Sequence, residues 1–300
     1  MNSRRLLTLY LTEIVRWQYQ NGNHPFFCRV AEVLQSRRWE VAVRLNSLEE
    51  RAQSRNRSGY ALFFEDNPFY ENSLTARRSY LDPFWQVEKS AERWEWAVAK
   101  AVFDPESVNG NRAAQFARFW RNRRGLAPEE PRGFLYVPLQ GHLQNQRSFQ
   151  SASSMKMLRE TAARAGGKRV VTTLHPREVY SDGELRSLAG LCDKTGIELS
   201  EKPMEDLLPH CDGVVTQNSS VAVLGFLLEK PAVVFSQIDF HHIAGSVPRD
   251  GLDTAFAALD AKPDFARYLF WFFQMQALNI WRPEFPERLI ERLQSHGWDV

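Results

Sequence analysis

The chain has 300 residues, 43% of them hydrophobic and 25% charged, which is the composition of a folded globular protein and excludes long disorder. Its length exceeds the usual single domain of about 100 to 200 residues and therefore predicts two domains or one large one. The 38 basic and 36 acidic residues leave a formal charge of +2, which is too small to draw the chain onto nucleic acid. The apolar runs 6–10 and 268–273 are too short for a signal sequence or a membrane span, so we expect a cytoplasmic protein.

The first part of the chain predicts a βαβ arrangement. The expected strands are 6–11, 40–45 and 60–64. The expected helices are 26–38, 84–100 and 111–124. The last helix ends at Gly125 and is followed by a turn-rich linker, 127–133. We place the end of an N-terminal, acceptor-side domain, residues 1–130, in this linker.

Beyond the linker, strands and helices alternate regularly. The expected strands are 134–138, 169–174, 197–199, 213–216 and 232–235. The expected helices are 153–165, 182–195, 204–208 and 219–228. Such alternation predicts a parallel sheet covered on both faces, with ligands bound at the carboxyl ends of its strands. This second domain is expected to span residues 131–262.

The segment 263–300 predicts two helices, 265–278 and 286–295, that pack across the domains. Residues Phe270, Trp271, Phe272 and Phe273 place aromatic rings on every face of the first of them. We favour core packing for this run, with an interdomain seat, a dimer contact or shallow membrane contact as the alternatives.

Polar residues follow two strands of the second domain. His175, Pro176 and Arg177 come after the strand 169–174, and Asn218, Ser219 and Ser220 come after the strand 213–216. An imidazole, serine hydroxyls and a helix N-terminus that Asn218 or Ser219 caps would together bind an anion. Taken alone, the His-Pro pair is more often a turn than a ligand site, and Asn-Ser-Ser is more often a simple helix cap. Their occurrence after two strands, which we expect to be neighbours, favours a phosphate site.

The loop after the strand 232–235 is unusually polar, which a bound ligand would explain. Its members are Ser236, Gln237, Asp239, His241 and His242. We do not expect the two histidines to bind metal, because adjacent side chains should diverge and no third ligand has a fixed spacing. The three cysteines lack metal-site spacing as well.

Taken in order, several motifs resemble those of bacterial capsular polysaccharide biosynthesis proteins. They are Val137-Pro138-Leu139-Gln140, Thr173-Leu174-His175-Pro176, the run 211–220 that ends in Gln217-Asn218-Ser219-Ser220, and Glu229-Lys230-Pro231-Ala232-Val233-Val234. The Kdo-transferase and sialyltransferase-like relatives of that family have the GT-B fold. The resemblance covers roughly residues 134–242.

The resemblance implies an α/β, GT-B-like fold with two Rossmann-like domains whose parallel sheets face a cleft. It also implies a metal-independent glycosyltransferase without a cofactor. The expected donor is a nucleotide-sugar, CMP-Kdo or a related acidic sugar, and the expected acceptor is a surface polysaccharide or glycolipid. This role is compatible with association at the inner membrane or with a biosynthetic complex.

The same resemblance assigns the donor phosphate to His175, Ser219 and Ser220. Their neighbours complete the predicted nucleotide site: Gln140, Pro176, Arg177, Gln217 and Asn218. Around a leaving phosphate, such donors would stabilise the transition state of glycosyl transfer. Residues expected to contact donor or acceptor in adjoining loops are Arg147, Asp239, His241 and His242, with Arg77 and Arg78 as further candidates for an acidic acceptor.

The catalytic residue is harder to place. Related capsule proteins carry an acidic residue soon after the Pro-Leu-Gln-like strand, whereas the loop 141–147 contains no carboxylate here. The remaining candidates for a base or nucleophile are His142 in that loop, Glu65 and Asp66 after the strand 60–64, and Glu13 after the first strand. Glu65 and Asp66 fit a solvated turn equally well, and His142 fits a role in holding the loop.

Two other functions fit the same residues. A histidine and serines that hold phosphate do not distinguish bases, so a UDP- or GDP-sugar enzyme or an epimerase of this fold is one alternative. The missing loop carboxylate allows the other, a non-catalytic module that binds a nucleotide or glycan.

Overall fold

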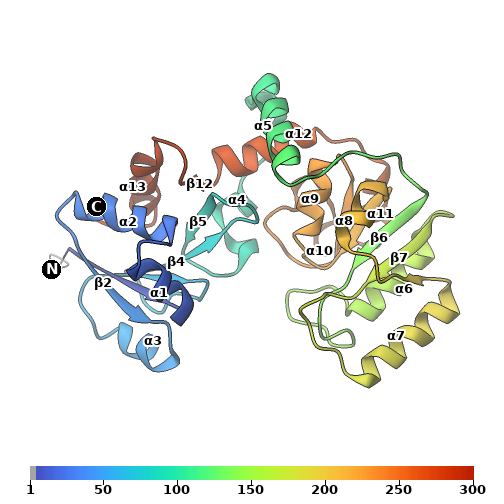
Figure 1. The fold of residues 1–300 in the computed structure, drawn as a ribbon, viewed down its shortest axis with the longest axis horizontal. Coiled ribbons are helices and arrows are strands. Elements are labelled where there is room, and N and C mark those ends of the chain that lie inside the picture. The colour runs from blue at the N-terminus through green and yellow to red at the C-terminus, as the bar shows by residue number, and fades with distance from the viewer. Residues whose placement is uncertain (1–4) are drawn as a thin grey trace. The chain divides into compact units, whose positions relative to one another are not determined.

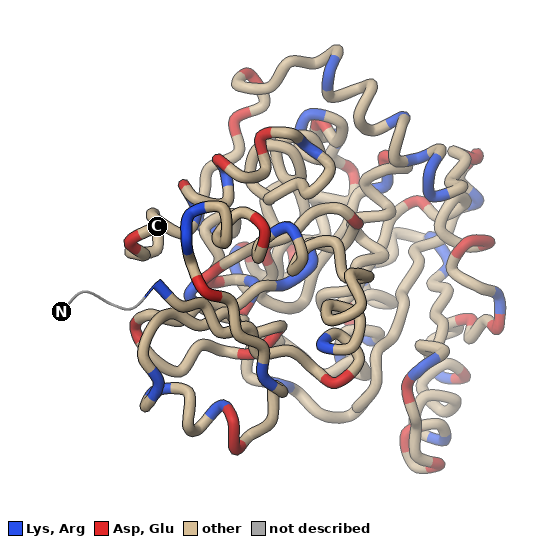
Figure 2. The backbone as a smooth tube through the Cα atoms, turned by 60° about the vertical axis from the view of Figure 1, so that its left-hand side comes forward, with Lys and Arg blue, Asp and Glu red and all other residues tan. Residues whose placement is uncertain are grey.

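The computed structural model describes residues 5–300 and divides them into two compact units (Figure 1). Unit 1 contains the described residues up to Ala101 together with Phe272–Val300, and unit 2 contains Val102–Trp271. The boundary therefore lies earlier than the predicted linker near residue 130, because the helix α5 (Gly110–Arg123) packs against α9 (Val221–Leu227) and α12 (Phe265–Phe270) of unit 2. Basic and acidic residues are interspersed along both units (Figure 2).

Unit 1 is built on a six-stranded sheet of order β12-β5-β4-β3-β1-β2. Its strands are β1 (Leu6–Leu11), β2 (Glu40–Leu45), β3 (Tyr60–Phe64), β4 (Ser73–Arg78), β5 (Phe84–Glu88) and β12 (Leu278–Asn279). The first four are parallel, while β5 runs antiparallel to β4 and β12 antiparallel to β5. Its helices are α1 (Glu13–Gln20), α2 (Pro25–Gln35), α3 (Leu48–Ser54), α4 (Ala97–Lys100) and α13 (Phe285–Ser295).

The predicted helix over 84–100 is wrong for most of its length. Residues 84–88 form β5, and of the rest only Ala97–Lys100 is α-helical. The side chains of β5 alternate with period two: Trp85 and Val87 join the core under α2, whereas Phe84 packs against Phe273 with ring centroids 4.9 Å apart. This alternation buries both faces of the strand.

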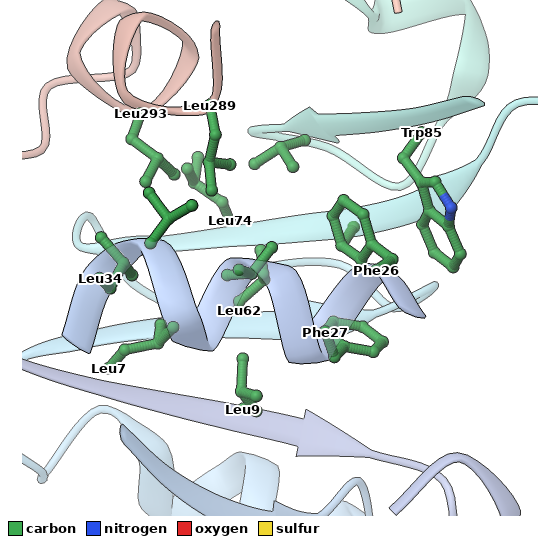
Figure 3. Close-up of a cluster of buried hydrophobic side chains, with 14 of the residues drawn as sticks. Leu7, Leu9, Phe26, Phe27, Leu34, Leu62, Leu74, Trp85, Leu289 and Leu293 are labelled. Carbon is green, nitrogen blue, oxygen red and sulfur yellow. The ribbon is translucent and has the colours of Figure 1, made fainter. Parts of the chain in front are cut away.

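The main core of unit 1 lies between its sheet and the helices α2 and α13 (Figure 3). Leu7, Leu9, Leu62 and Leu74 point from the strands towards the apolar faces of these helices. α13, red in Figure 1, thus lies beside the blue α2 although more than 240 residues separate them in sequence. The last segment of the chain is therefore part of the first domain.

Unit 2 contains a six-stranded sheet of order β11-β10-β9-β6-β7-β8 in which all neighbours are parallel. Its strands are β6 (Phe134–Pro138), β7 (Arg169–Thr173), β8 (Glu198–Leu199), β9 (Gly213–Thr216), β10 (Ala232–Val234) and β11 (Gly245–Ser246). Its other helices are α6 (Ser154–Arg164), α7 (Asp182–Thr195), α8 (Met204–Leu207), α10 (Val247–Asp250) and α11 (Leu252–Ala257). Counted along the unit, this is the strand order 3-2-1-4-5-6 of dinucleotide-binding domains.

Helices cover both faces of this sheet, as predicted. Val137, Val215 and Val233 share a core with residues of α6, α7 and α11 on one face. Val214 points to the opposite face, where a Cβ on Gly225 of α9 would lie 3.3 Å from its methyl group. A glycine here lets α9 lie close against the sheet.

The predicted helix over 265–278 is interrupted. α12 ends at Phe270, a π-helical turn covers Trp271–Met275, and β12 follows at the edge of the unit 1 sheet. Of the four aromatic residues in this run, Trp271, Phe272 and Phe273 are buried and Phe270 is half-buried. No helix within residues 5–300 is both long and apolar enough to cross a membrane.

Candidate functional site

The strand order of unit 2 defines where a ligand would bind. From β6 the chain moves outward through β7 and β8, and it then returns to place β9 on the other side of β6. In parallel sheets the loops at such a reversal diverge and leave a crevice at the carboxyl edge. By this rule the ligand is expected between the loop after β6, which begins with Leu139 and Gln140, and the loop after β9, which begins with Gln217 and Asn218. Five predicted donor-site positions follow the two strands that bracket the reversal: Gln140, Gln217, Asn218, Ser219 and Ser220.

His175 follows β7, which is not a neighbour of β9. β6 lies between these two strands, so the prediction that the two motifs follow adjoining strands is wrong. The reason is the reversal of strand order, which local sequence does not encode. The loop after β6 consequently lies between the two predicted phosphate-binding motifs.

The imidazole of His175 is oriented by its own loop. Its Nδ1 accepts a hydrogen bond from the Arg177 N–H at 3.2 Å, so a neutral ring carries its hydrogen on Nε2. The backbone N–H of His175 donates to the Tyr180 hydroxyl at 2.8 Å. His175 is half-buried, while Pro176 and Arg177 are exposed. The ring can therefore offer an Nε2–H donor to an anionic oxygen.

The loop after β9 differs from the expected helix cap. α9 begins at Val221, and the side chain of Ser220 makes no capping hydrogen bond. Instead, the Ser219 hydroxyl accepts from the Val221 N–H at 3.2 Å. Because it accepts that bond, the hydroxyl keeps its own hydrogen for a ligand. Asn218 and Ser219 are half-buried and Ser220 is exposed.

Gln217 holds this edge of the sheet together. Its amide nitrogen donates to the Ala152 carbonyl at 2.9 Å, and its amide oxygen accepts from the Ser236 hydroxyl at 2.9 Å. The side chain is buried. Both polar groups of the Gln217 amide thus form hydrogen bonds within unit 2. These bonds hold the start of the loop after β9 in place.

Sequence reasoning missed Glu178. A Cβ on Gly141 would overlap the Glu178 carboxylate, so this carboxylate lies directly over the loop after β6. A larger residue at position 141 would displace this side chain. A carboxylate therefore lies beside the loop 141–147, but it comes from the loop after β7. Spacing along the chain gives no signal for this contact, because the contact depends on β6 lying beside β7 in the sheet.

Glu184 fixes the same loop from the first turn of α7. One of its carboxylate oxygens accepts from the Leu143 N–H at 2.7 Å, and the other accepts from the N–H and hydroxyl of Ser181. The Ser181 N–H, then the Ser181 hydroxyl and the Leu143 N–H, hold the pKa of Glu184 below its ordinary value. His142, which is exposed and has a positive φ of 61°, lies in the loop so anchored.

We expect Glu184→Gln to destabilise the protein at neutral pH. Because the folded-state pKa of Glu184 is lowered, its stabilisation is present above the unfolded pKa and is lost as the pH falls through the folded pKa. The difference in unfolding free energy between wild type and variant should therefore shrink in acid. Urea titrations between pH 7 and pH 3 measure it, with Glu201→Gln, on an exposed loop, as the control. A difference that is constant across this range would contradict the assignment.

The loop after β10 has a different arrangement from the one expected. The rings of His241 and His242 do not diverge: they stack with centroids 4.4 Å apart. His241 Nδ1 lies 3.0 Å from a guanidinium nitrogen of Arg249. The Arg249 guanidinium also donates to both carboxylate oxygens of Asp250, and these hydrogen bonds lower the pKa of Asp250. His242 Nδ1 lies 3.2 Å from the Tyr268 hydroxyl.

Two other residues were predicted to contact the donor or the acceptor, one in this loop and one near it. Asp239 is buried. Arg147 is exposed, and its backbone N–H donates to Gln150 at 2.8 Å. Within residues 5–300, no three His, Cys, Asp or Glu side chains gather as a metal site would require.

Unit 1 has its own reversal of strand order, between β1 and β3. Glu13 is the first residue of α1, directly beyond the carboxyl end of β1, and is exposed. Glu65 and Asp66 follow β3, and the structure separates their roles. Asp66 accepts a hydrogen bond from Asn46 and lies 3.1 Å from Arg51. Glu65, with a positive φ of 63°, lines a pocket of about 480 Å³.

No protein-family model matches the sequence, and no curated protein matches it. Its structure is similar to that of KpsC from Thermosulfurimonas dismutans, described as a β-Kdo 2,7 transferase, with a TM-score of 0.54 at 15% identity over 97% of this chain and 98% of that chain. The wall teichoic acid polymerase TagF aligns over 86% of this chain and 77% of that chain at 10% identity, with a TM-score of 0.31, which is too low to indicate a shared fold. The likeness to KpsC shows a GT-B-like α/β fold with two parallel-rich sheets.

Proposed function

We propose that this protein is a glycosyltransferase that uses a nucleotide-activated sugar as donor and a surface polysaccharide or glycolipid as acceptor. The observation that carries the proposal is the reversal of strand order between β6 and β9, because the loop after β9 carries the predicted phosphate-binding residues Asn218, Ser219 and Ser220. The GT-B-like fold supports it. The ordered sequence motifs favour CMP-Kdo or a related acidic sugar as the donor.

In this proposal, unit 2 stabilises the leaving phosphate. The Nε2–H of His175 and the hydroxyls of Ser219 and Ser220 would donate hydrogen bonds to it as the bond from the anomeric carbon to the phosphate oxygen breaks. Donors fixed in place before the reaction stabilise developing charge without reorganisation. The electron pair of the broken bond leaves with the phosphate, and no cofactor takes part.

Glu65 is the carboxylate we assign to the acceptor side. It lines a pocket, whereas Asp66 is already held by Asn46 and Arg51. As the acceptor oxygen bonds to the anomeric carbon, Glu65 would take the proton of the acceptor hydroxyl. Glu178, which lies over Gly141, would position the loop after β6.

A panel of CMP, UDP, GDP and their sugar conjugates tests the donor site by thermal shift. We expect stabilisation by CMP and CMP-sugars. His175→Ala should weaken binding about 10- to 100-fold, the effect of losing a hydrogen bond to a charged group. His210→Ala is the matched control because His210 precedes β9, at the opposite edge of the same sheet.

The outcomes separate the alternatives. Stabilisation by UDP or GDP instead of CMP would support the predicted nucleotide site but would show that the donor carries a different base. If no nucleotide stabilises the fold, or if His175→Ala and His210→Ala act alike, the donor site is wrong.

A further inference from the structure

Unit 1 contains a pocket at the carboxyl edge of its sheet. Its volume is about 480 Å³, within the range of small-molecule sites. The walls come from the ends of β3 and β4, the start of β5, the first turn of α2 and the residues after β12. The pocket thus lies beside the reversal of strand order between β1 and β3, where an open parallel sheet binds its ligands.

Aromatic rings form one side of this pocket. Phe26 and Trp85, both in its lining, stack with centroids 4.2 Å apart, beside the N-terminal end of α2 (Figure 3). His24 lies edge-on to Trp85 at 5.6 Å. Trp281, also in the lining, is 49% exposed. Flat apolar surfaces with polar edges suit the apolar face of a sugar ring.

Trp85 and His24 each carry an N–H donor. The indole Nε1–H of Trp85 is buried and has no hydrogen-bond partner, although the residue is only 5% exposed. His24 caps α2, with its Nδ1 accepting from the Phe27 N–H at 3.4 Å. Burial lowers the pKa of His24, so the neutral ring keeps its hydrogen on Nε2. A buried donor without a partner costs stability unless a ligand satisfies it.

The lining of the pocket has no excess of positive charge. Its charged residues are two carboxylates, Glu65 and Asp82, and one arginine, Arg78, which forms an ion pair with Asp82 at 2.9 Å. Such a lining favours a neutral ligand that exchanges hydrogen bonds over a phosphate or a nucleotide.

We propose that this pocket binds a neutral, hydroxyl-bearing sugar, the end of the acceptor, with Trp281 as its stacking surface and His24 and Trp85 as its N–H donors. The identification of the sugar as the acceptor rests on the proposed glycosyltransferase function. Binding of a neutral sugar to the pocket does not depend on that function. An experiment can therefore overturn the sugar pocket and the glycosyltransferase function independently.

The test titrates the full chain with methyl glycosides of glucose, galactose, mannose and N-acetylglucosamine, without any nucleotide. The indole N–H resonances of the nine tryptophans report binding site by site, and spectra of Trp85→Phe and Trp281→Phe assign the two relevant signals. At least one glycoside should shift both signals in a saturable manner.

Three variants sharpen the test. His24→Asn keeps a helix-capping side chain and removes the imidazole donor, and Trp281→Ala changes a half-exposed residue; both should fold normally and weaken glycoside binding about tenfold, as expected for losing one buried polar or aromatic contact. Trp298→Phe is the matched control. Its indole Nε1 is also buried without a partner, but the residue packs against Trp39 and Tyr60, outside the pocket.

The proposal is overturned if no glycoside shifts the Trp85 and Trp281 signals, or if the His24 and Trp281 variants bind as tightly as the Trp298 variant. It is also overturned if CMP, rather than a glycoside, shifts those signals. If glycosides bind as expected while no nucleotide binds to unit 2, the sugar pocket stands and the glycosyltransferase function falls.

Discussion

Glu65→Gln is expected to lower the rate of sugar transfer by about 10²- to 10⁴-fold, the usual contribution of a general base. The replacement removes the proton acceptor but keeps the shape of the side chain. Glu65 lines the pocket of unit 1, and it lies in unit 1 whereas the proposed nucleotide site lies in unit 2. Nucleotide affinity should therefore be unchanged. The loss should appear in kcat, measured by nucleotide release with saturating donor and acceptor.

Asp66→Asn is the matched control for this experiment. Its carboxylate is one residue away, but it is held by Asn46 and Arg51. We expect the Asp66 variant to retain most of its kcat and to lose some stability. A large loss of kcat in the Asp66 variant with full activity in the Glu65 variant would reverse the assignment. A loss in Glu178→Gln alone would place the base in unit 2.

Arg292→Ala is expected to destabilise unit 1 by about 3–5 kcal/mol, the cost of leaving a buried charge without its partner. Arg292, on α13, lies 2.9 Å from Glu88 of β5, and the Glu88 side chain is only 5% exposed. Arg292 also donates to Gln86 at 2.8 Å and to the Gln276 carbonyl at 2.7 Å. It therefore ties α13 to both β5 and the segment before β12.

Hydrogen exchange during urea unfolding measures this effect separately for each unit. Peptides from β5 and α13 should lose protection in the Arg292 variant, whereas those of unit 2 should not. Arg169→Ala is the control, because the Arg169–Glu198 pair is more than half exposed and such pairs contribute about 0–1 kcal/mol. Equal destabilisation by both variants would show that burial of Glu88 has no special cost.

Five parallel strands, β1, β2, β3, β6 and β9, begin and end at the predicted residues, because each is a short apolar run bounded by polar or turn residues. The parallel strand β4 was not predicted. β5 was missed because its Trp and Glu residues suit a helix equally well. Only the neighbours of β5 in the sheet decide that it is a strand.

The candidate site also depends on contacts between strands that the sequence does not reveal. The polar loops after β6, β7 and β9 could be predicted, because parallel strands place such loops at one edge of the sheet. The order of the strands could not, so the place of β6 between β7 and β9 was missed. The contact between Glu178 and Gly141 depends on that order. No spacing along the chain indicates it.

The return of Phe272–Val300 to unit 1 has a consequence for synthesis on the ribosome. Unit 2 is continuous in sequence and can fold once residue 271 has emerged, because domains fold as units during translation. Unit 1 begins first but cannot bury Leu7, Leu9 and Leu34 against α13 until Leu289 and Leu293 have been made. Until α13 has been synthesised, the apolar surface of unit 1 that packs against it therefore stays exposed.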